Sequence, residues 1–283
     1  MNVRELATRA AAEASRLRAK YGIGPSDAVC PFELADRIGL SVRLIALSSL
    51  EAIYAREPSP VILLSTERPA GRRRYSCAHE IGHHVFGHGT CLDQLFDDDP
   101  GAWSSDEFLA HRFAAGLLMP KIAVEAAFDR RGWSLKSPRP NEVYVVAQNF
   151  GVGYTTLIGH MECTLRCVLS SVATGLLKQK LTQLRSDLAG FQIDQDLLVV
   201  DDHWGERPIE LEIGDVAVIP PSAGFTGACA IRKTKPRVHI AATISGSGSV
   251  ALNNSRSIEI RVSRPRFTGL ARYRYLEEPA DAE

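Results

Sequence analysis

The segment His79-Glu80-Ile81-Gly82-His83 has the pattern H-E-x-x-H, and it decides how the first half of the chain is interpreted. Four residues advance an α-helix by about 400°, so the two histidines lie on one helical face and can bind one metal ion. Imidazole is a common zinc ligand, and the neighbouring carboxylate can accept a proton from a water that zinc activates. The pattern therefore predicts zinc-dependent hydrolysis of an amide bond, with His79 and His83 as ligands and Glu80 as general base.

The residues around this motif favour a buried metal site over a solvated helix face. Ala78, Ile81, Val85 and Phe86 make the helix largely apolar, and buried histidines and carboxylates need partners. Gly82 weakens a helix by roughly 0.5–1 kcal/mol, which is easier to understand if another group approaches closely there.

A catalytic zinc site needs a third protein ligand and one open position, and the two histidines that follow the motif do not fit that role. His84 directly follows His83, so on a helix its side chain points about 100° away. His88 is one residue too close for the metzincin spacing H-E-x-x-H-x-x-G-x-x-H, and Phe86 stands where that pattern needs glycine.

Glu107 is the third candidate, at the start of a predicted helix from Asp106 to Met119. The apolar residues of this helix predict that it packs against the motif helix. However, Ser104-Ser105-Asp106-Glu107 also fits a capping box, in which Glu107 would only satisfy backbone N–H groups. Spacing alone leaves ligand and cap equally open.

Two motifs in order along the chain resemble the ImmA/IrrE family of metallopeptidases. They are Arg72-Arg73-Arg74-Tyr75-Ser76-Cys77-Ala78-His79-Glu80-Ile81-Gly82-His83-His84, and then Glu107 followed by Ala110, Phe113-Ala114-Ala115 and Leu117-Leu118-Met119-Pro120. The resemblance covers roughly residues 5–160. Where the family has E-x-E-A-N before F-A-A, this chain has Glu107-Phe108-Leu109-Ala110-His111, so only the first glutamate matches and histidine replaces asparagine.

The resemblance implies a zincin-like catalytic domain in which Zn2+ is bound by His79, His83 and Glu107. His111, one helical turn beyond Glu107, becomes an outer group beside the metal or a rival ligand. The family's substrate would be a helix-turn-helix transcriptional repressor, cleaved to derepress a stress, mobile-element or defence programme. Manganese or another divalent ion is an alternative to zinc.

A peptidase also needs a hydrogen-bond donor besides zinc for the oxyanion of its transition state. Tyr75, His84, His88 and His111 are the nearby candidates. The sequence does not choose among them.

The whole pattern predicts an α+β protein of two domains: a mostly helical, zincin-like catalytic domain with a small sheet at residues 1–165, and a β-rich sensor or recruitment domain at residues 166–283. The predicted helices are residues 3–20, Phe32–Ile38, the motif helix, Asp106–Met119, two or three up to about Met161, and Val172–Leu188. The predicted strands are Ser41–Leu47, Glu51–Ala55, Pro60–Ser65, Leu197–Val200, Ile209–Ile213, Val216–Ile219, Val238–Ile240 and Ser257–Val262. A polar, acidic loop is predicted from Asp93 to Ser104.

Two segments raise the question of DNA binding. Residues at about 140–161 resemble a helix-turn-helix, but the second helix, Gly153–His160, has no lysine or arginine to neutralise phosphates, so DNA is the weaker candidate partner. Between residues 232 and 274, ten lysines and arginines accompany a single acidic residue, Glu259. These charges form either an interaction patch or, as we favour, a set spread over the solvent faces of several strands.

The overall composition is that of an ordinary globular protein, with 45% hydrophobic residues, 23% charged residues and no formal net charge. No apolar run approaches the roughly 18 residues of a membrane span, and the N-terminus lacks the apolar region of a secretory signal. The six cysteines have no framework spacing, which predicts reduced thiols in a cytoplasmic protein.

Two other functions compete with that of a peptidase. In the first, the same fold binds a repressor without cleaving it, as an antirepressor with a structural zinc. The intact Glu80 argues against this, since a structural site has no use for a carboxylate there. In the second, the helix-turn-helix-like segment and the C-terminal region bind DNA.

Overall fold

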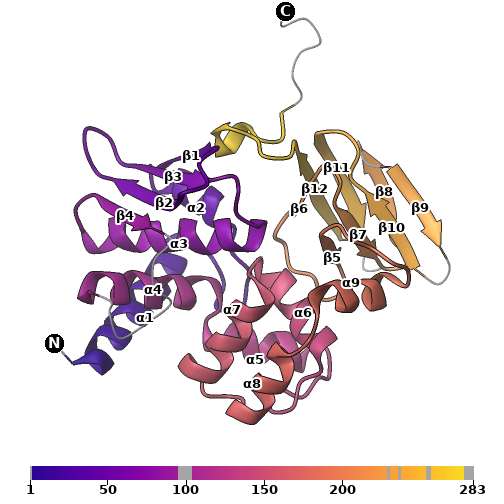
Figure 1. The fold of residues 1–283 in the computed structure, drawn as a ribbon, viewed down its shortest axis with the longest axis horizontal. Helices are drawn as coiled ribbons and strands as arrows, with labels where there is room; N and C mark the ends of the chain where they lie inside the picture. The colour runs from indigo at the N-terminus through magenta and orange to yellow at the C-terminus, as the bar shows by residue number, and fades with distance from the viewer. Residues whose placement is uncertain (1, 95–103, 228–229, 235–236, 253–255, 277–283) are drawn as a thin grey trace, which may run out of the picture.

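The computed structural model describes residues 2–94, 104–227, 230–234, 237–252 and 256–276, and these form an α+β structure (Figure 1). The helices are α1 Val3–Lys20, α2 Pro31–Arg37, α3 Ala70–Phe86, α4 Ser105–Leu118, α5 Lys121–Asp129, α6 Pro140–Phe150, α7 Tyr154–Gly159, a π-helical turn His160–Thr164, α8 Ser170–Leu177, α9 Leu181–Ala189 and a 3-10 turn Ala271–Tyr273. The strands are β1 Ser41–Ile45, β2 Leu50–Ala55, β3 Val61–Ser65, β4 Cys91–Gln94, β5 Leu197–Val199, β6 Ile209–Glu212, β7 Val216–Ile219, β8 Gly224–Gly227, β9 Ala230–Thr234, β10 Arg237–Ala241, β11 Gly246–Ala251, β12 Ser257–Ser263 and β13 Gly269–Leu270.

The first sheet supports the motif helix. Its strand order is β13-β1-β3-β2-β4, with β1 and β3 parallel and the other neighbours antiparallel. Side chains alternate along β2, where Leu50, Ala52 and Tyr54 are buried. Helix α3 packs against β2 and β3 and, on another side, against α4. The motif helix is therefore held between a sheet and a second helix.

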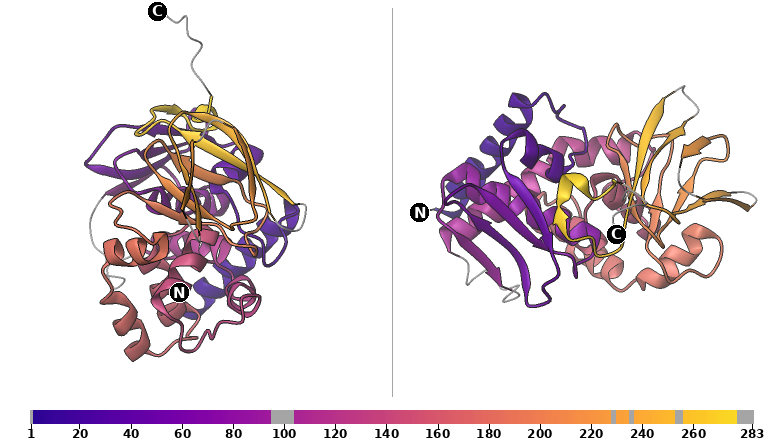
Figure 2. Two further views of the ribbon diagram at one scale, coloured as in Figure 1. Left: turned by 90° about the vertical axis from the view of Figure 1, so that its right-hand side faces the viewer. Right: turned by 90° about the horizontal axis from the view of Figure 1, so that it is seen from above.

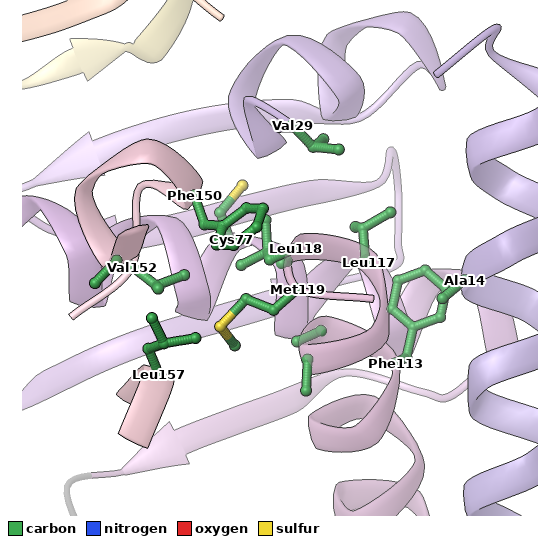
Figure 3. Packing of buried hydrophobic residues seen from close by; sticks show 14 of the residues in the cluster. Ala14, Val29, Cys77, Phe113, Leu117, Leu118, Met119, Phe150, Val152 and Leu157 are labelled. Carbon is green, nitrogen blue, oxygen red and sulfur yellow. The ribbon is translucent and has the colours of Figure 1, made fainter. Parts of the chain in front are cut away.

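The helices share one hydrophobic core with this sheet. Figure 3 shows Leu118 of α4 and its C-terminal cap Met119 close to Phe150 of α6 and Cys77 of α3, while Phe113 of α4 lies on the side of α1. All five side chains are fully buried. Burial of this apolar surface fixes α3 and α4 relative to each other, which is what a site made from both helices requires.

Two further sheets form a sandwich with its own core. Their strand orders are β5-β7-β10-β9 and β6-β12-β11-β8. Residues of both sheets, such as Ile240 from one and Ile260 from the other, belong to one buried cluster that also contains Trp204. The sandwich lies beside the helical part of the molecule (Figures 1 and 2).

After β12 the chain returns to the first sheet. Strand β13 pairs antiparallel with β1, with Arg43 opposite Leu270, and Ala271 joins the first core. In Figure 2 this yellow segment lies between the first sheet and the sandwich. Ion pairs also connect the sandwich and the C-terminal segment to earlier parts of the chain: Arg73–Glu212, Arg74–Glu210, Arg131–Asp201, Arg261–Glu33, Arg266–Glu67 and Arg272–Asp36.

Several predictions from the sequence need correction. The single helix predicted for Val172–Leu188 is two helices, α8 and α9, separated at residues 178–180. The predicted loop Asp93–Ser104 begins too early, because Asp93 and Gln94 belong to β4, and residues 95–103 lie outside the described part. Strands β4, β8, β9, β11 and β13 were not predicted.

The basic residues near the C-terminus are not simply spread over solvent faces. Arg261, Arg266 and Arg272 pair with carboxylates of the N-terminal part, and Arg274 is buried against Glu210. The side chains at 232–237 lie outside the described part. None of the described helices combines the length and the apolar character needed to cross a bilayer.

Candidate metal centre

Helix α3 presents the motif residues in a buried position. His79 is 7% exposed, and Glu80 and His83 are 0% exposed. The two histidines are one helical turn apart on one face, as the spacing predicted, and their Nε2 atoms lie 3.0 Å from each other. Both rings therefore direct the same nitrogen to one point.

Glu107 faces these two nitrogens from the first turn of α4. Its Oε2 lies 3.1 Å from His79 Nε2, and its Oε1 lies 3.4 Å from His83 Nε2. Part of the capping box considered as the alternative role of Glu107 is also present. The Ser104 hydroxyl accepts a hydrogen bond from the Glu107 backbone N–H at 3.2 Å. The backbone of Glu107 is thus capped by Ser104, and its carboxylate is directed to the histidines.

The donor set suits a divalent metal ion. Donors placed 2.0–2.1 Å from a tetrahedral zinc would be roughly 3.3 Å apart, close to the 3.0, 3.1 and 3.4 Å between the three side chains. Among the described residues, His79, His83 and Glu107 form a group that could hold a metal ion, with ligand atoms all within 4.8 Å of one another. Hydrogen bonds with His79 and His83 hold the pKa of Glu107 well below its usual range, so it is an anion at neutral pH.

Close packing of α3 on α4 brings the donors together. A Cβ atom added to Gly82 would lie 3.0 Å from Ala110 Cα, 3.2 Å from the Ala110 carbonyl oxygen and 3.2 Å from Phe113 Cδ1. The close approach predicted at this glycine is therefore confirmed. Any larger residue would push α4, and Glu107 with it, away from α3. This accounts for a glycine inside the helix despite its lower helix propensity.

Tyr75 and His111 lie next to each other, one turn from His79 and Glu107 respectively. The Tyr75 hydroxyl is 3.2 Å from His111 Nε2, and the two rings are 5.4 Å apart. Burial, with a contribution from His79, lowers the pKa of His111 to about 3, and burial raises the pKa of Tyr75. Both side chains are therefore neutral at neutral pH and can act as hydrogen-bond donors.

The other two histidines near the motif have separate partners. His84 Nδ1 lies 2.9 Å from the Tyr54 hydroxyl on β2. His88 lies against the side of His83 that is remote from Glu107, with its Nδ1 2.9 Å from His83 Nδ1. Burial lowers the pKa of both His84 and His88. The Oδ1 atom of Asp106 lies 3.4 Å from His88 Nε2. The sequence analysis did not identify Asp106 as part of the site, and its position next to Glu107 is the only sequence signal that could have done so.

One comparison with known proteins covers the part of the chain that contains both motifs. Residues 35–158 match the family model described as the IrrE N-terminal-like domain of the peptidase M78 family, so the family resemblance is confirmed for this part of the chain. Among solved structures, the chain is similar to a Mycobacterium tuberculosis transcriptional regulator, with 18% identity and a TM-score of 0.36 over 56% of this chain and 46% of that one. The chain thus spans less than half of that protein. No curated protein matches.

Proposed function

We propose, taking residues 35–158 as an IrrE N-terminal-like domain of the M78 peptidases, that this protein is a zinc-dependent endopeptidase. In this proposal His79, His83 and Glu107 hold the ion, and Glu80 is the general base. Residues 1–165 are proposed as the zincin-like catalytic domain, whose first sheet strand β13 completes, and the rest of residues 166–283 is proposed to sense a signal or recruit the substrate.

One observation carries the proposal. Three side chains from two helices direct donor atoms to one point, at separations of 3.0 to 3.4 Å, and Glu80 directly follows one of them in the sequence. A purely structural cap at Glu107 would not require its carboxylate to face both imidazoles. A buried carboxylate at Glu80, 0% exposed, also has a clear use in proton transfer.

The residues divide the chemistry among them. A bound zinc ion supplies Lewis-acid polarisation of the scissile carbonyl and of the attacking water. Glu80 takes the proton from that water as it attacks the amide carbon, and then delivers a proton to the departing amine. Tyr75 and His111 are the proposed oxyanion donors, since both are neutral and lie one turn from the donor set.

The proposed substrate is a helix-turn-helix transcriptional repressor. This assignment follows from the family resemblance, and cleavage would then derepress a stress, mobile-element or defence programme. Helices α6 and α7, joined by residues 151–153, are proposed to help dock the substrate rather than DNA.

The test compares the parent protein with Glu80→Gln. We expect both to bind about one zinc per chain, and the variant to cleave the product of an adjacent repressor-like gene about 10²–10⁴ times more slowly. Glu125→Gln on α5, whose side chain is 50% exposed, is the matched control and should cleave at the parent rate.

Two outcomes would overturn the proposal. If the parent protein binds no divalent metal, the proposed metal centre is wrong. If Glu80→Gln still derepresses the target gene as fully as the parent does, the non-proteolytic antirepressor would be the better description.

A further inference from the structure

His88 is held in a fixed position against His83 by the end of α3. Gly87 ends this helix in the left-handed conformation, with φ 71°. The turn lets the His88 backbone N–H donate to the His83 carbonyl at 3.0 Å, as in a common helix C-cap. The His88 ring stacks on Phe86, with 5.7 Å between centroids and 25° between planes. The ring is thus fixed from two sides.

With a metal at His79, His83 and Glu107, the contact between the His83 and His88 imidazoles would have one consistent arrangement of protons. His83 directs Nε2 to His79 and Glu107, so this nitrogen is the one available to a metal. A neutral His83 then carries its proton on Nδ1. His83 Nδ1 lies 2.9 Å from His88 Nδ1, so in this tautomer His83 would donate and His88 would accept.

The same arrangement defines the far side of His88. A neutral His88 that accepts at Nδ1 carries its own proton on Nε2. This nitrogen faces Asp106 Oδ1 at 3.4 Å. The Asp106 side chain is 57% exposed and its contact with His88 is long. Asp106 therefore contributes less to the orientation of His83 than His88 does. The chain of contacts runs from Asp106 through His88 to His83.

We propose that His88 is a positioning residue of the metal centre, which fixes the ring orientation and tautomer of His83 so that Nε2 is presented to the metal. It takes the place that a carboxylate or backbone carbonyl usually holds behind a metal-bound histidine. The role rests on the proposed function, because it requires a metal at His79, His83 and Glu107. The proposal also gives a function to His88, which the metzincin spacing excludes as a metal ligand.

The experiment measures zinc affinity by competition with a chromophoric chelator. His88→Ala should bind zinc about 10–100 times more weakly than the parent. His88→Asn should recover most of this loss, because the Asn Oδ1 can occupy the place of the accepting Nδ1. Asp106→Asn should weaken binding by less than about tenfold. His84→Ala, on α3 beside His83 but paired with Tyr54, is the matched control and should bind as the parent does.

A second measurement does not depend on any variant. Long-range 1H–15N spectra of the zinc-loaded parent should show His83 protonated on Nδ1 and His88 protonated on Nε2. A proton on His88 Nδ1, or zinc binding by His88→Ala within twofold of the parent, would overturn the proposal. If His88→Asn is as weak as His88→Ala, the acceptor role is also wrong. A parent protein that binds no zinc would refute both this role and the proposed function, whereas normal binding by the parent and by His88→Ala would refute this role alone.

Discussion

His160 is a buried histidine whose protonation should control part of the stability of the fold. It is 7% exposed, and its Nε2 donates to the Met119 carbonyl at 2.8 Å. Burial lowers the pKa of His160 from 6.5 to about 4. The unfolded chain therefore binds this proton more readily than the folded chain, so the contribution of His160 is fully present above pH 6.5 and is lost as the pH falls towards 4.

The expected loss between pH 7 and pH 5 is about 2 kcal/mol in the free energy of unfolding. We would measure it by urea denaturation of the metal-free parent and of His160→Gln, whose difference isolates this group. The exposed His203→Gln is the control, and its curve should follow that of the parent. A parent and a His160→Gln variant with the same pH dependence would contradict the prediction.

The residues of the candidate centre differ in how far the sequence could predict them. His79, Glu80 and His83 follow from helix geometry alone, because their contacts are local. Glu107 needed the family resemblance, since the spacing from Ser104 fits a cap equally well, and the structure contains the Ser104 cap as well. The role of His88 depends on the direction of the chain after Gly87, which a ligand-spacing pattern does not include.

At the scale of helices, the contact between α3 and α4 depends on Gly82. Gly82→Ala places a methyl group 3.0 Å from Ala110 Cα, and a helix backbone cannot move aside as a side chain can. We expect the metal-free protein to lose about 1–3 kcal/mol of unfolding free energy. Zinc should also bind more weakly, because α4 carries Glu107.

Gly175→Ala in α8 is the matched control for this prediction. An added Cβ there meets nothing within 4 Å, so the change should stabilise the protein by about 0.5–1 kcal/mol through helix propensity. Urea denaturation and the chelator competition would measure both variants. If Gly82→Ala were as stable as the parent and bound zinc equally well, close packing would not be what brings the donors together.

Elements with strong periodicity were predictable, and those defined by distant partners were not. Helix α1 and strands β1 to β3 have local patterns that predict them to within a few residues. Strand β11 has few side chains that could produce a pattern. Its Gly248 approaches Gly227 of β8 so closely that a Cβ added to Gly227 would lie 2.5 Å from Gly248 Cα. Strand β13 is two residues long, and it is defined only by its pairing with β1.

At the scale of the whole molecule, Glu210 connects the sandwich to the motif helix. This carboxylate accepts from Arg74 of α3 at 2.9 Å and from Arg274 at 2.6 Å, and Arg207 lies 3.7 Å away. Burial alone would raise the pKa of Glu210, but the three arginines lower it well below its usual range. Some of the excess basic residues of the C-terminal sequence therefore form buried ion pairs. Composition could not reveal these pairs, because the acidic partners are distant in sequence.

Glu210→Gln should be the most damaging of these substitutions, because it removes the only negative charge that Arg74, Arg207 and Arg274 share in their described ion pairs. Removing one partner of a buried ion pair leaves the other charge uncompensated, at a cost of about 3–5 kcal/mol. Guanidinium denaturation measures that loss, and faster hydrogen exchange in α3 should accompany it, because Arg74 lies on that helix.

Glu259→Gln provides the comparison, since Glu259 also pairs with an arginine, Arg261 at 2.7 Å, but is 46% exposed. Water already screens that pair, so its loss should change the unfolding free energy by less than about 1 kcal/mol. Equal, small effects of the two substitutions would mean that the arginines around Glu210 are solvated in practice, and that the sandwich is not coupled to α3 through this carboxylate.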